Sequence, residues 1–197
     1  MCDICGEPLH TAGICKQCQS TRPAYYALRS CVVYTDPARS ALINLKYKRQ
    51  VGLGDALALP LADFLQELGW KAELILPIPL SEQRFSERGY NQVELIAHPM
   101  AQLIGWKYST RALRRIRHTD SQVGLGAGAR KKNVSGAFVA DARLVSGKIL
   151  LLIDDTTTTG ATLDAASRSL LDAGAVRVYA LTFAKALAKN SLDFPSS

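Results

Sequence analysis

The amino-acid sequence predicts an α/β fold in which a mostly parallel central sheet is flanked by helices. Two apolar runs, at 148–153 and 176–183, are typical of buried strands, and residues 161–173 between them are typical of a helix that ends at a glycine. Short links join these elements, and a strand–helix–strand unit of this kind has parallel strands. With 48% hydrophobic and 21% charged residues, the 197-residue chain can bury a core, which excludes a disordered protein.

The first half of the chain predicts a strand at residues 31–34 and two helices at 38–48 and 55–68. Asp36 and Pro37 are expected to be the N-cap and the first position of the first helix, because aspartate accepts from free N–H groups and proline has none to lose. Gly69 is expected to end the second helix, since glycine readily adopts the left-handed backbone that closes helices.

The second half predicts a buried strand at 73–78, a basic loop at 81–89 and a helix at 90–104. An extended basic segment at 106–117 and a glycine-containing loop or weak helix at 118–133 are expected to follow. Pro99 should kink or split the helix, because proline lacks the N–H of the helical hydrogen bond. We expect the chain to divide into an N-terminal module at 1–22, a main domain at 23–190 and a tail at 191–197.

Four of the five cysteines form two closely spaced pairs, Cys2-x2-Cys5 and Cys15-x2-Cys18. Two intervening residues allow a tight turn that directs both sulfur atoms of a pair toward one ion, and four thiolates are typical of structural zinc. Zinc binding would supply most of the folding energy of so short a segment. The alternatives are a redox pair or two disulfides. Cys31 is expected to be a small buried residue of a strand.

The distribution of charge and apolar residues narrows the class of protein. No apolar run approaches the length of about 18 residues that a membrane span needs, and no basic stretch followed by an apolar one begins the chain, so we expect a cytoplasmic protein. The net charge of +7 is concentrated in residues 107–132, which hold eight Lys and Arg against one acid. Such a segment attracts pyrophosphate, nucleic acid or an anionic membrane surface; the alternative is a solvated face.

The segment 154–162, Asp-Asp-Thr-Thr-Thr-Thr-Gly-Ala-Thr, joins a predicted strand to a predicted helix. Ligands bind at the carboxyl ends of parallel strands, and the free N–H groups of the next helix favour phosphate. Gly160 lets the backbone approach closely, and threonine hydroxyls can donate. Asp154 and Asp155 would repel that phosphate, so they should face vicinal hydroxyls or a metal ion. Together these features predict a site for a 5-phosphoribosyl group.

Competing phosphate-binding motifs fit this segment less well. No Gly-x4-Gly-Lys-Ser/Thr is present, and the glycines at 124, 126 and 128 lack the context and spacing of a dinucleotide-binding loop. The remaining alternative is a polar strand-to-helix turn capped by Asp and Thr, but a cap needs one such residue rather than six in a row.

Residues 153–162 resemble the ribose-5-phosphate motif of type I phosphoribosyltransferases. Further stretches narrow the resemblance to the ComF family of competence-associated, phosphoribosyltransferase-like proteins: the N-terminal cysteines, Leu45-Lys46-Tyr47, Pro77-Ile78-Pro79-Leu80, Arg84-x3-Arg88-Gly89-Tyr90-Asn91-Gln92, Thr119-x2-Gln122 and Arg130-x2-Asn133-Val134-x-Gly136-Ala137-Phe138. The resemblance covers nearly the full length. It implies a type I phosphoribosyltransferase-like fold with a small N-terminal zinc module.

The resemblance also implies a ligand, phosphoribosyl diphosphate, and residues to bind it. Asp154 and Asp155 would hold the ribose hydroxyls, directly or through Mg²⁺. Arg84 and Arg88, which follow the strand 73–78, are our candidates for the pyrophosphate. The 5-phosphate would bind to Thr156, Thr157, Thr158, Thr159, Gly160, Ala161 and Thr162.

Two further side chains have two interpretations each. Arg130 is another candidate for the pyrophosphate or a solvated charge. Asn91 is expected either to orient the loop before it or simply to begin a helix.

Thr158 stands where 6-oxopurine transferases of this fold carry an aspartate that handles the proton of the base, so we do not expect hypoxanthine or guanine as acceptors.

Two classes of function remain open from the sequence. The first is phosphoribosyl transfer to an unknown acceptor with Mg²⁺ as cofactor. The second is a non-catalytic protein that binds single-stranded nucleic acid and uses the fold as a scaffold or sensor. The family implies a role in natural transformation, with single-stranded DNA and the DNA-uptake machinery as partners. DNA binding by the basic segment, which is poor in aromatic residues, would be mainly electrostatic.

Overall fold

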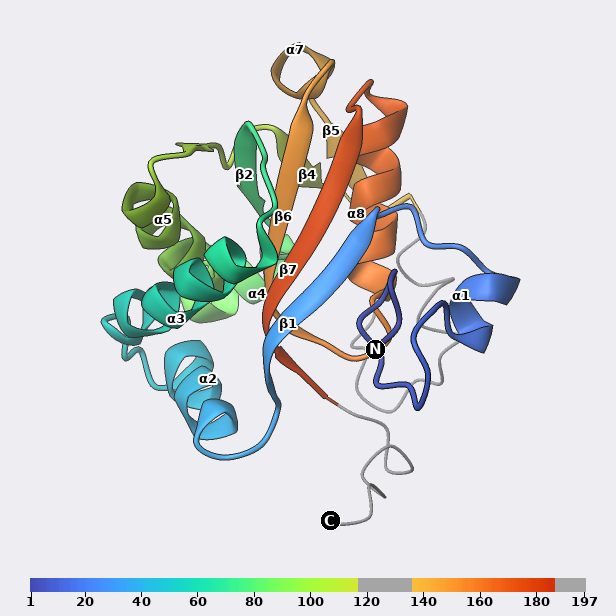
Figure 1. Cartoon of the computed structure of the whole chain (residues 1–197). Coiled ribbons are helices and arrows are strands. Elements are labelled where there is room, and N and C mark those ends of the chain that lie inside the picture. Colours follow the sequence, from blue (N-terminus) through green and yellow to red (C-terminus); the bar gives the residue numbers. More distant parts are fainter. Residues whose placement is uncertain (117–135, 187–197) are drawn as a thin grey trace.

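The computed structural model describes residues 1–116 and 136–186, and Figure 1 shows how their elements are arranged. Five parallel strands form the central sheet in the order β1-β7-β6-β2-β3. Their bounds are Ala27–Val33 (β1), Leu74–Pro77 (β2), Lys107–Tyr108 (β3), Ile149–Thr157 (β6) and Arg177–Lys185 (β7). The prediction of a mostly parallel sheet is confirmed.

Helices cover both faces of this sheet. Helix α8 lies on one face, and α2, α3 and α5 lie on the other (Figure 1). The helices are α1 (Lys16–Ser20), α2 (Ala38–Tyr47), α3 (Leu53–Leu68), α4 (Glu82–Arg88), α5 (Gln92–Ile104), α7 (Ala142–Val145) and α8 (Ala161–Asp172). The short strands β4 (Leu113–Arg115) and β5 (Phe138–Ala140) form a separate antiparallel ribbon.

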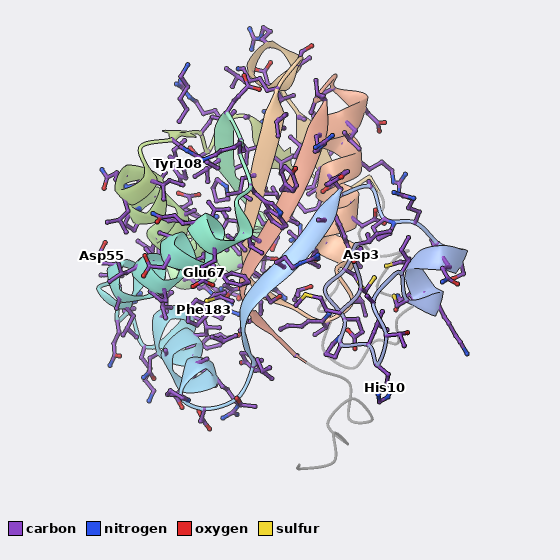
Figure 2. The ribbon with its side chains drawn as sticks, in the orientation of Figure 1. Asp3, His10, Asp55, Glu67, Tyr108 and Phe183 are labelled. Carbon is purple, nitrogen blue, oxygen red and sulfur yellow. The ribbon has the colours of Figure 1, made fainter. Side chains whose placement is uncertain are left out.

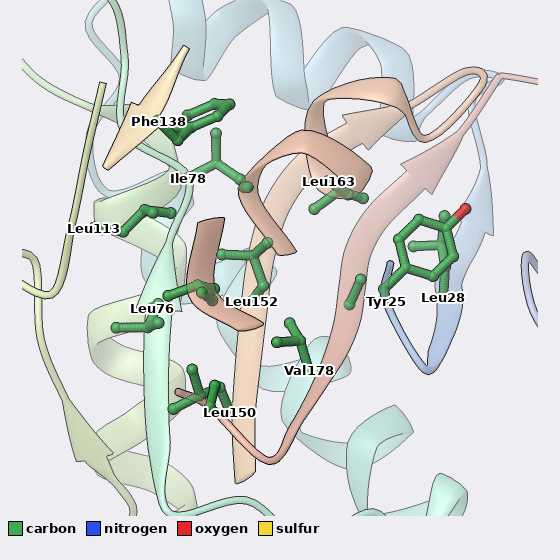
Figure 3. Packing of buried hydrophobic residues seen from close by; sticks show 14 of the residues in the cluster. Tyr25, Leu28, Leu76, Ile78, Leu113, Phe138, Leu150, Leu152, Leu163 and Val178 are labelled. Carbon is green, nitrogen blue, oxygen red and sulfur yellow. The ribbon is translucent and has the colours of Figure 1, made fainter. Parts of the chain in front are cut away.

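The apolar run of β6 explains why this strand lies inside the sheet. From Leu150 to Ile153 its side chains alternate between the two faces and are fully buried on both. Leu150 and Leu152 join the cluster beneath α8, whereas Leu151 and Ile153 join the cluster beneath α2, α3 and α5. Figure 3 shows the first cluster, which Leu163 of α8 completes. Burying each such side chain contributes roughly 1.5–3 kcal/mol.

Residues 81–89 form a helix and not the predicted basic loop. Ser81 accepts a hydrogen bond from the backbone N–H of Arg84 (3.4 Å), and Gly89 ends α4 with a left-handed backbone (φ 80°). No residue of α4 is buried. The helix therefore lacks the apolar periodicity by which a sequence reveals most helices.

Helix α5 begins at Gln92, two residues later than predicted, and Pro99 does not split it. Proline leaves the carbonyl of Leu95 without its usual helical donor. That carbonyl lies against Gly54 of α3, where a β-carbon would come within 2.3 Å of the oxygen. The missing side chain of the glycine thus lets the two helices pack closely beside the proline, and α5 continues to Ile104.

Among the other element ends that differ from the prediction, three have a visible physical cause. Strand β1 begins at Ala27, four residues earlier than expected, because it pairs with β7 from there on. The N-cap of α2 is Pro37 and not Asp36, whose carboxylate accepts from the Ser40 hydroxyl (2.5 Å) instead of from a helical N–H. Strand β6 runs four residues past its expected end to Thr157, because its pairing with β7 continues to that residue.

The remaining expectations divide into those confirmed and those outside the described residues. Gly69 ends α3 with φ 63°, and the segment 106–117 contains β3 and β4. The predicted loop or weak helix at 118–133, including Arg130, and the tail at 191–197 lie outside the described residues. The domain boundaries stay a prediction. Within residues 1–116 and 136–186, no helix combines the length and apolar character needed to cross a membrane.

Candidate functional site

Asp154 and Asp155 lie in the carboxyl half of β6. Because side chains alternate along a strand, the two neighbouring carboxylates lie on opposite faces of the sheet. Asp154 belongs to the face covered by α8, and Asp155 belongs to the face covered by α2 and α5. The two acids therefore have different neighbours, although each still affects the pKa of the other.

Asp155 is almost fully buried, with 4% of its surface exposed. Its Oδ2 atom lies 2.5 Å from the Lys46 ammonium and accepts a bond from the Gln92 amide (3.3 Å), and its Oδ1 atom accepts from the Thr156 hydroxyl (3.2 Å). Burial by itself would raise the pKa of Asp155, but the Lys46 charge and these bonds outweigh it and hold the pKa below its usual value. Asp155 is therefore an ionised, internally paired carboxylate.

Asp154 has different partners. Its Oδ1 atom accepts from the backbone N–H of Asp155 (2.8 Å). Burial, together with the charge of Asp155, raises the pKa of Asp154 well above its usual range. The positive charge of Arg115 acts on Asp154 from β4. A cationic sugar or metal ion bound beside Asp154 would favour its ionised form.

Arg115 is a candidate residue that the sequence reveals only as one charge of the segment 107–132. Its guanidinium lies over the Phe138 ring, with 5.5 Å between Cζ and the ring centroid. Burial and then the nearby Arg84 lower the pKa of Arg115, while Asp154 raises it. Arg84 of α4 therefore lies near Arg115 of β4, and Arg115 in turn lies near Asp154.

The loop after β6 is shorter than predicted and consists of residues 158–160. Gly160 has a left-handed backbone (φ 75°) and is the N-cap of α8, with no side-chain cap bond. A β-carbon at this position would lie 2.8 Å from the Tyr25 hydroxyl, so only glycine fits. The Thr159 hydroxyl accepts from the N–H of Ala161 (3.4 Å). This helix start is well suited to bind an anion.

The threonines of the motif fall into two groups. Thr156 and Thr157 belong to β6; the Thr156 hydroxyl lies 3.4 Å from the Lys46 ammonium, and Thr157 is buried. Thr158 and Thr159 belong to the loop, and Thr158 is exposed. Ala161 and Thr162 form the first turn of α8. The predicted phosphate-binding role of all seven residues from Thr156 to Thr162 stays a prediction.

The residues predicted to follow β2 reach the same neighbourhood. Arg88 donates to the Gln92 side chain (2.5 Å), which in turn donates to Asp155. Asn91 fulfils both of its proposed roles: its Nδ2 atom donates to the carbonyl of Ile78 (3.0 Å), and its Oδ1 atom caps α5 by accepting from Val93 (3.0 Å). It therefore begins the helix and also holds the preceding loop.

The four cysteines of the N-terminal module converge as predicted. Their sulfur atoms all lie within 4.8 Å of one another, and the Sγ atoms of Cys5 and Cys15 are 3.7 Å apart. Two sulfurs bound to one tetrahedral zinc are about 3.8 Å apart. All five cysteines are free thiols, which disfavours the disulfide alternative. Figure 2 shows the sulfur atoms of the module beside Asp3. The arrangement fits a structural metal such as zinc.

Cys31 lies apart from this cluster. It belongs to β1, as predicted, but it is only partly buried, because its side chain packs at the margin of the core beneath α3. Its thiol donates to the carbonyl of Pro60 (3.7 Å). The cysteine thus contributes to strand packing and not to the metal cluster.

The module lies against the threonine loop. Lys185, at the end of β7, pairs with Glu7 (2.7 Å) and donates to the carbonyl of Cys5 (3.2 Å). On the other side, the N–H of Ala24 donates to Asp164 in the first turn of α8 (2.6 Å). A cavity of about 220 Å³ lies between module and loop, and its walls include Cys5, Cys18, Thr158 and Thr159.

Sequence comparisons agree with these features, although no protein-family model matches the chain. The chain is 32% identical to the DNA utilization protein YhgH of Salmonella typhi, over 90% of its own length and 81% of that protein. It belongs to the ComF family. It is also 28% identical to competence protein F of Haemophilus influenzae (94% and 84% covered) and 29% identical to competence protein ComFC of Bacillus subtilis (88% and 72% covered).

Solved structures relate the fold of this ComF-family chain to known enzymes. The glutamine phosphoribosylpyrophosphate amidotransferase of B. subtilis, complexed with ADP and GMP, matches with a TM-score of 0.51 and 18% identity. The match covers 72% of this chain and 30% of that protein. At such low identity the likeness concerns the fold alone, which is that of type I phosphoribosyltransferases. The predicted family and fold are thus confirmed.

Proposed function

We propose that this chain binds 5-phosphoribosyl diphosphate with Mg²⁺ at the carboxyl edge of its sheet and transfers the phosphoribosyl group to an acceptor. One observation carries the proposal: a strand with two acids in its carboxyl half leads, through a left-handed glycine, into a helix whose N-cap makes no side-chain cap bond. The backbone N–H groups and the positive dipole end of a helix start attract a phosphate, while carboxylates attract sugar hydroxyls or a metal ion.

The surrounding residues support this assignment of roles. Thr158, Thr159 and the backbone of residues 160–162 would bind the 5-phosphate, and Asp154 would accept from the ribose hydroxyls. Arg84, Arg88 and Arg115 would neutralise the pyrophosphate, and Arg130 is a further candidate outside the described residues. Bound Mg²⁺ would add charge neutralisation at the phosphoryl groups, and the carboxylate oxygens near the site are of the donor type that this ion prefers.

Phosphoribosyl transfer makes limited chemical demands on these residues. The bond from the anomeric carbon to pyrophosphate breaks, the sugar passes through a cationic, oxocarbenium-like transition state, and the acceptor then bonds to the same carbon. The chain must position the sugar, stabilise the departing pyrophosphate and exclude water. Fixed carboxylates near the sugar would favour its positive charge, and fixed arginines would favour the leaving group.

The names of the relatives support an association with DNA utilization or competence. We therefore extend the proposal to a role in handling incoming DNA in the cytoplasm. A groove of about 610 Å³ on the β4–β5 ribbon favours a second candidate function, binding of single-stranded nucleic acid without catalysis. Its walls include Arg111, Arg114 and Arg143, together with the acid Asp141. Arg143 is paired with Asp141 (2.7 Å), so Arg111 and Arg114 are the guanidinium groups that would bind a phosphodiester backbone.

Calorimetry with phosphoribosyl diphosphate and MgCl₂, followed by an assay of pyrophosphate release with a panel of acceptors, tests the first function. We expect binding by the natural chain and a large loss in Asp154→Asn. The matched control is Asp63→Asn, which changes an exposed acid of α3. Absence of heat with the natural chain would refute ligand binding, and turnover of hypoxanthine would refute the expected acceptor exclusion.

The same preparations distinguish the second function. Binding without pyrophosphate release, together with affinity for single-stranded DNA, would favour a scaffold or sensor. Because that DNA binding would be electrostatic, raising the salt from about 50 to 200 mM should weaken it steeply. Affinity that is independent of salt would contradict a phosphodiester contact by the arginine groove.

A further inference from the structure

The last turn of α2 contacts the end of α4 and the segment that joins α4 to α5. The Tyr90 hydroxyl donates to the carbonyl of Leu45 (2.5 Å). The Arg88 guanidinium lies over the Tyr47 ring, 5.0 Å from Cζ to the centroid, and one of its nitrogens is 3.5 Å from the Tyr47 hydroxyl. Lys46 stands between these two anchored residues, so the direction of its side chain is fixed by contacts on both sides.

Lys46 reaches from this turn into the candidate site. Its ammonium lies 2.5 Å from Asp155 and 3.4 Å from the Thr156 hydroxyl. The Lys46 side chain is 15% exposed, and the Asp155 side chain is 5% exposed. Removing both charges from water is costly, and a pair buried to this degree persists only when each partner neutralises the other. The pair therefore holds both side chains in one arrangement.

This pair makes the two acids unequal toward a ligand. Both oxygens of Asp155 already accept hydrogen bonds from the chain: Oδ2 from Lys46 and Gln92, and Oδ1 from Thr156. Asp154 accepts from a neighbouring backbone N–H, and it forms no comparable ion pair within the described part of the chain. An incoming hydroxyl or hydrated cation would have to displace Lys46 or Gln92 to reach Oδ2 of Asp155, whereas no such ion pair within the described residues has to be broken to reach Asp154.

We propose that Lys46 is a positioning residue that keeps Asp155 as an internal acceptor, so that Asp154 receives the sugar of the bound ligand. This inference rests on the proposed binding of phosphoribosyl diphosphate. Asp155, held by Lys46 and Gln92, fixes the end of β6 and the Thr156 hydroxyl. Lys46 acts on the ligand only through Asp155 and does not touch it.

The experiment is a double-mutant cycle with two measurements on every variant: the Kd for phosphoribosyl diphosphate with Mg²⁺ and the midpoint of thermal unfolding. The variants are Lys46→Met, Asp155→Asn, the combination of both, and Asp154→Asn. Lys48→Met is the control, because Lys48 follows the same helix, carries the same charge and is exposed.

We expect Lys46→Met and Asp155→Asn each to weaken binding by about tenfold to a hundredfold, the usual effect of losing a residue that orients a ligand-binding group. The double variant should bind like either single variant, because residues that act as a unit are not additive. Asp154→Asn should weaken binding most, and Lys48→Met should leave it unchanged. The double variant should also regain part of the thermal stability that each single variant loses.

Three results would overturn the inference. A Lys46→Met variant that loses stability but binds the ligand with natural affinity would make Lys46 purely structural. Additive losses in the double variant would mean that Lys46 contacts the ligand directly. A greater loss in Asp155→Asn than in Asp154→Asn would reverse the roles of the acids.

The unfolding data separate this inference from the proposed function. If the natural chain fails to bind phosphoribosyl diphosphate while the cycle shows thermal coupling, the proposed function and the ligand role of Lys46 both fail, and only the ion pair remains. If the natural chain binds and the cycle shows no coupling in either measurement, the proposed function stands and the positioning role of Lys46 is wrong.

Discussion

The N-terminal module and the central sheet are held together by different means. In the sheet, every residue of β6 from Leu150 to Ile153 is fully buried, so apolar burial orders the strand. In residues 1–22 only Cys2, Ile4 and Cys18 are buried, and two of these three belong to the cysteine cluster. We therefore expect the module to depend on a bound metal, whereas the sheet depends on its core. The loop at residues 158–160 contacts both the module and the sheet, so we expect its conformation to depend on both.

Removal of the metal should have the largest effect on stability, and it should act on the module and not on the sheet. Structural zinc contributes roughly 10–16 kcal/mol of binding free energy in small zinc modules, so chelation should unfold residues 1–22 while the sheet persists. Hydrogen exchange monitored by NMR should show fast exchange in the module and continued protection in β6.

A matched pair of variants checks the source of that effect. Cys5→Ser should release the metal, and Cys31→Ser, outside the cluster, should retain it. Module amides that stay protected after complete chelation would contradict the comparison, because the module would then be ordered by its own packing.

Leu152→Ala should destabilise the sheet and leave the metal site intact. Loss of a fully buried leucine costs about 2–5 kcal/mol, because it removes apolar burial and leaves a cavity. Urea unfolding should show this loss, while zinc bound per folded chain stays constant. Leu59→Ala, at a position 54% exposed, is the control and should change stability little. Equal losses in the two variants would argue against a core centred on β6.

Gly160→Ala should affect the loop that touches both regions. The left-handed backbone costs a residue with a β-carbon about 1–2 kcal/mol, and the added carbon would press on the Tyr25 hydroxyl at 2.8 Å. We expect a lower thermal midpoint and weaker binding of phosphoribosyl diphosphate. Gly52→Ala is matched, because Gly52 has a helical backbone (φ −62°) and open space around it. Unchanged stability in Gly160→Ala would mean that the loop is held loosely.

Glu7→Gln should have the smallest effect, because it removes one bridge between module and sheet. The Lys185 side chain is 9% exposed and that of Glu7 is 33% exposed, so solvent screens the pair partly and a loss of about 1 kcal/mol or less is expected. Thermal unfolding in low and high salt measures it. A loss as large as that of Leu152→Ala would show that the bridge, and not the core, holds the two regions together.

The sequence predicted best those features that depend on neighbouring residues. The apolar runs of β6 and β7, the glycine at the end of α3 and the paired cysteines each act over a few positions, and each is visible in the sequence. Helix α4 was missed because its stability comes from Ser81 and Gly89 at its ends rather than from an apolar face. The continuation of β6 to Thr157 was missed because the apolar run ends at Ile153 and polar residues follow. The pairing with β7 that extends the strand is not visible in the sequence.

The candidate site was predicted less completely, for the same physical reason. Asp154, Asp155 and Gly160 are close together in the chain and form a recognisable pattern. Lys46 and Arg115 come from α2 and β4, and only the folded chain brings them to the acids. Lys46 belongs to a stretch that carries the family resemblance, and a buried acid without a cation in its own segment is the signal that such a partner must exist.

The contacts of Lys185 with the cysteine module, and of Asp164 with Ala24 just after it, have a practical consequence. If the module holds zinc as proposed, protein purified in the presence of EDTA, or produced without supplied zinc, would lose these contacts on one side of the proposed phosphate site. Ligand titrations of such material would then average over metal-bound and metal-free molecules and give too low an apparent affinity. Metal content per chain should therefore be measured on the same batch that is used for each ligand titration.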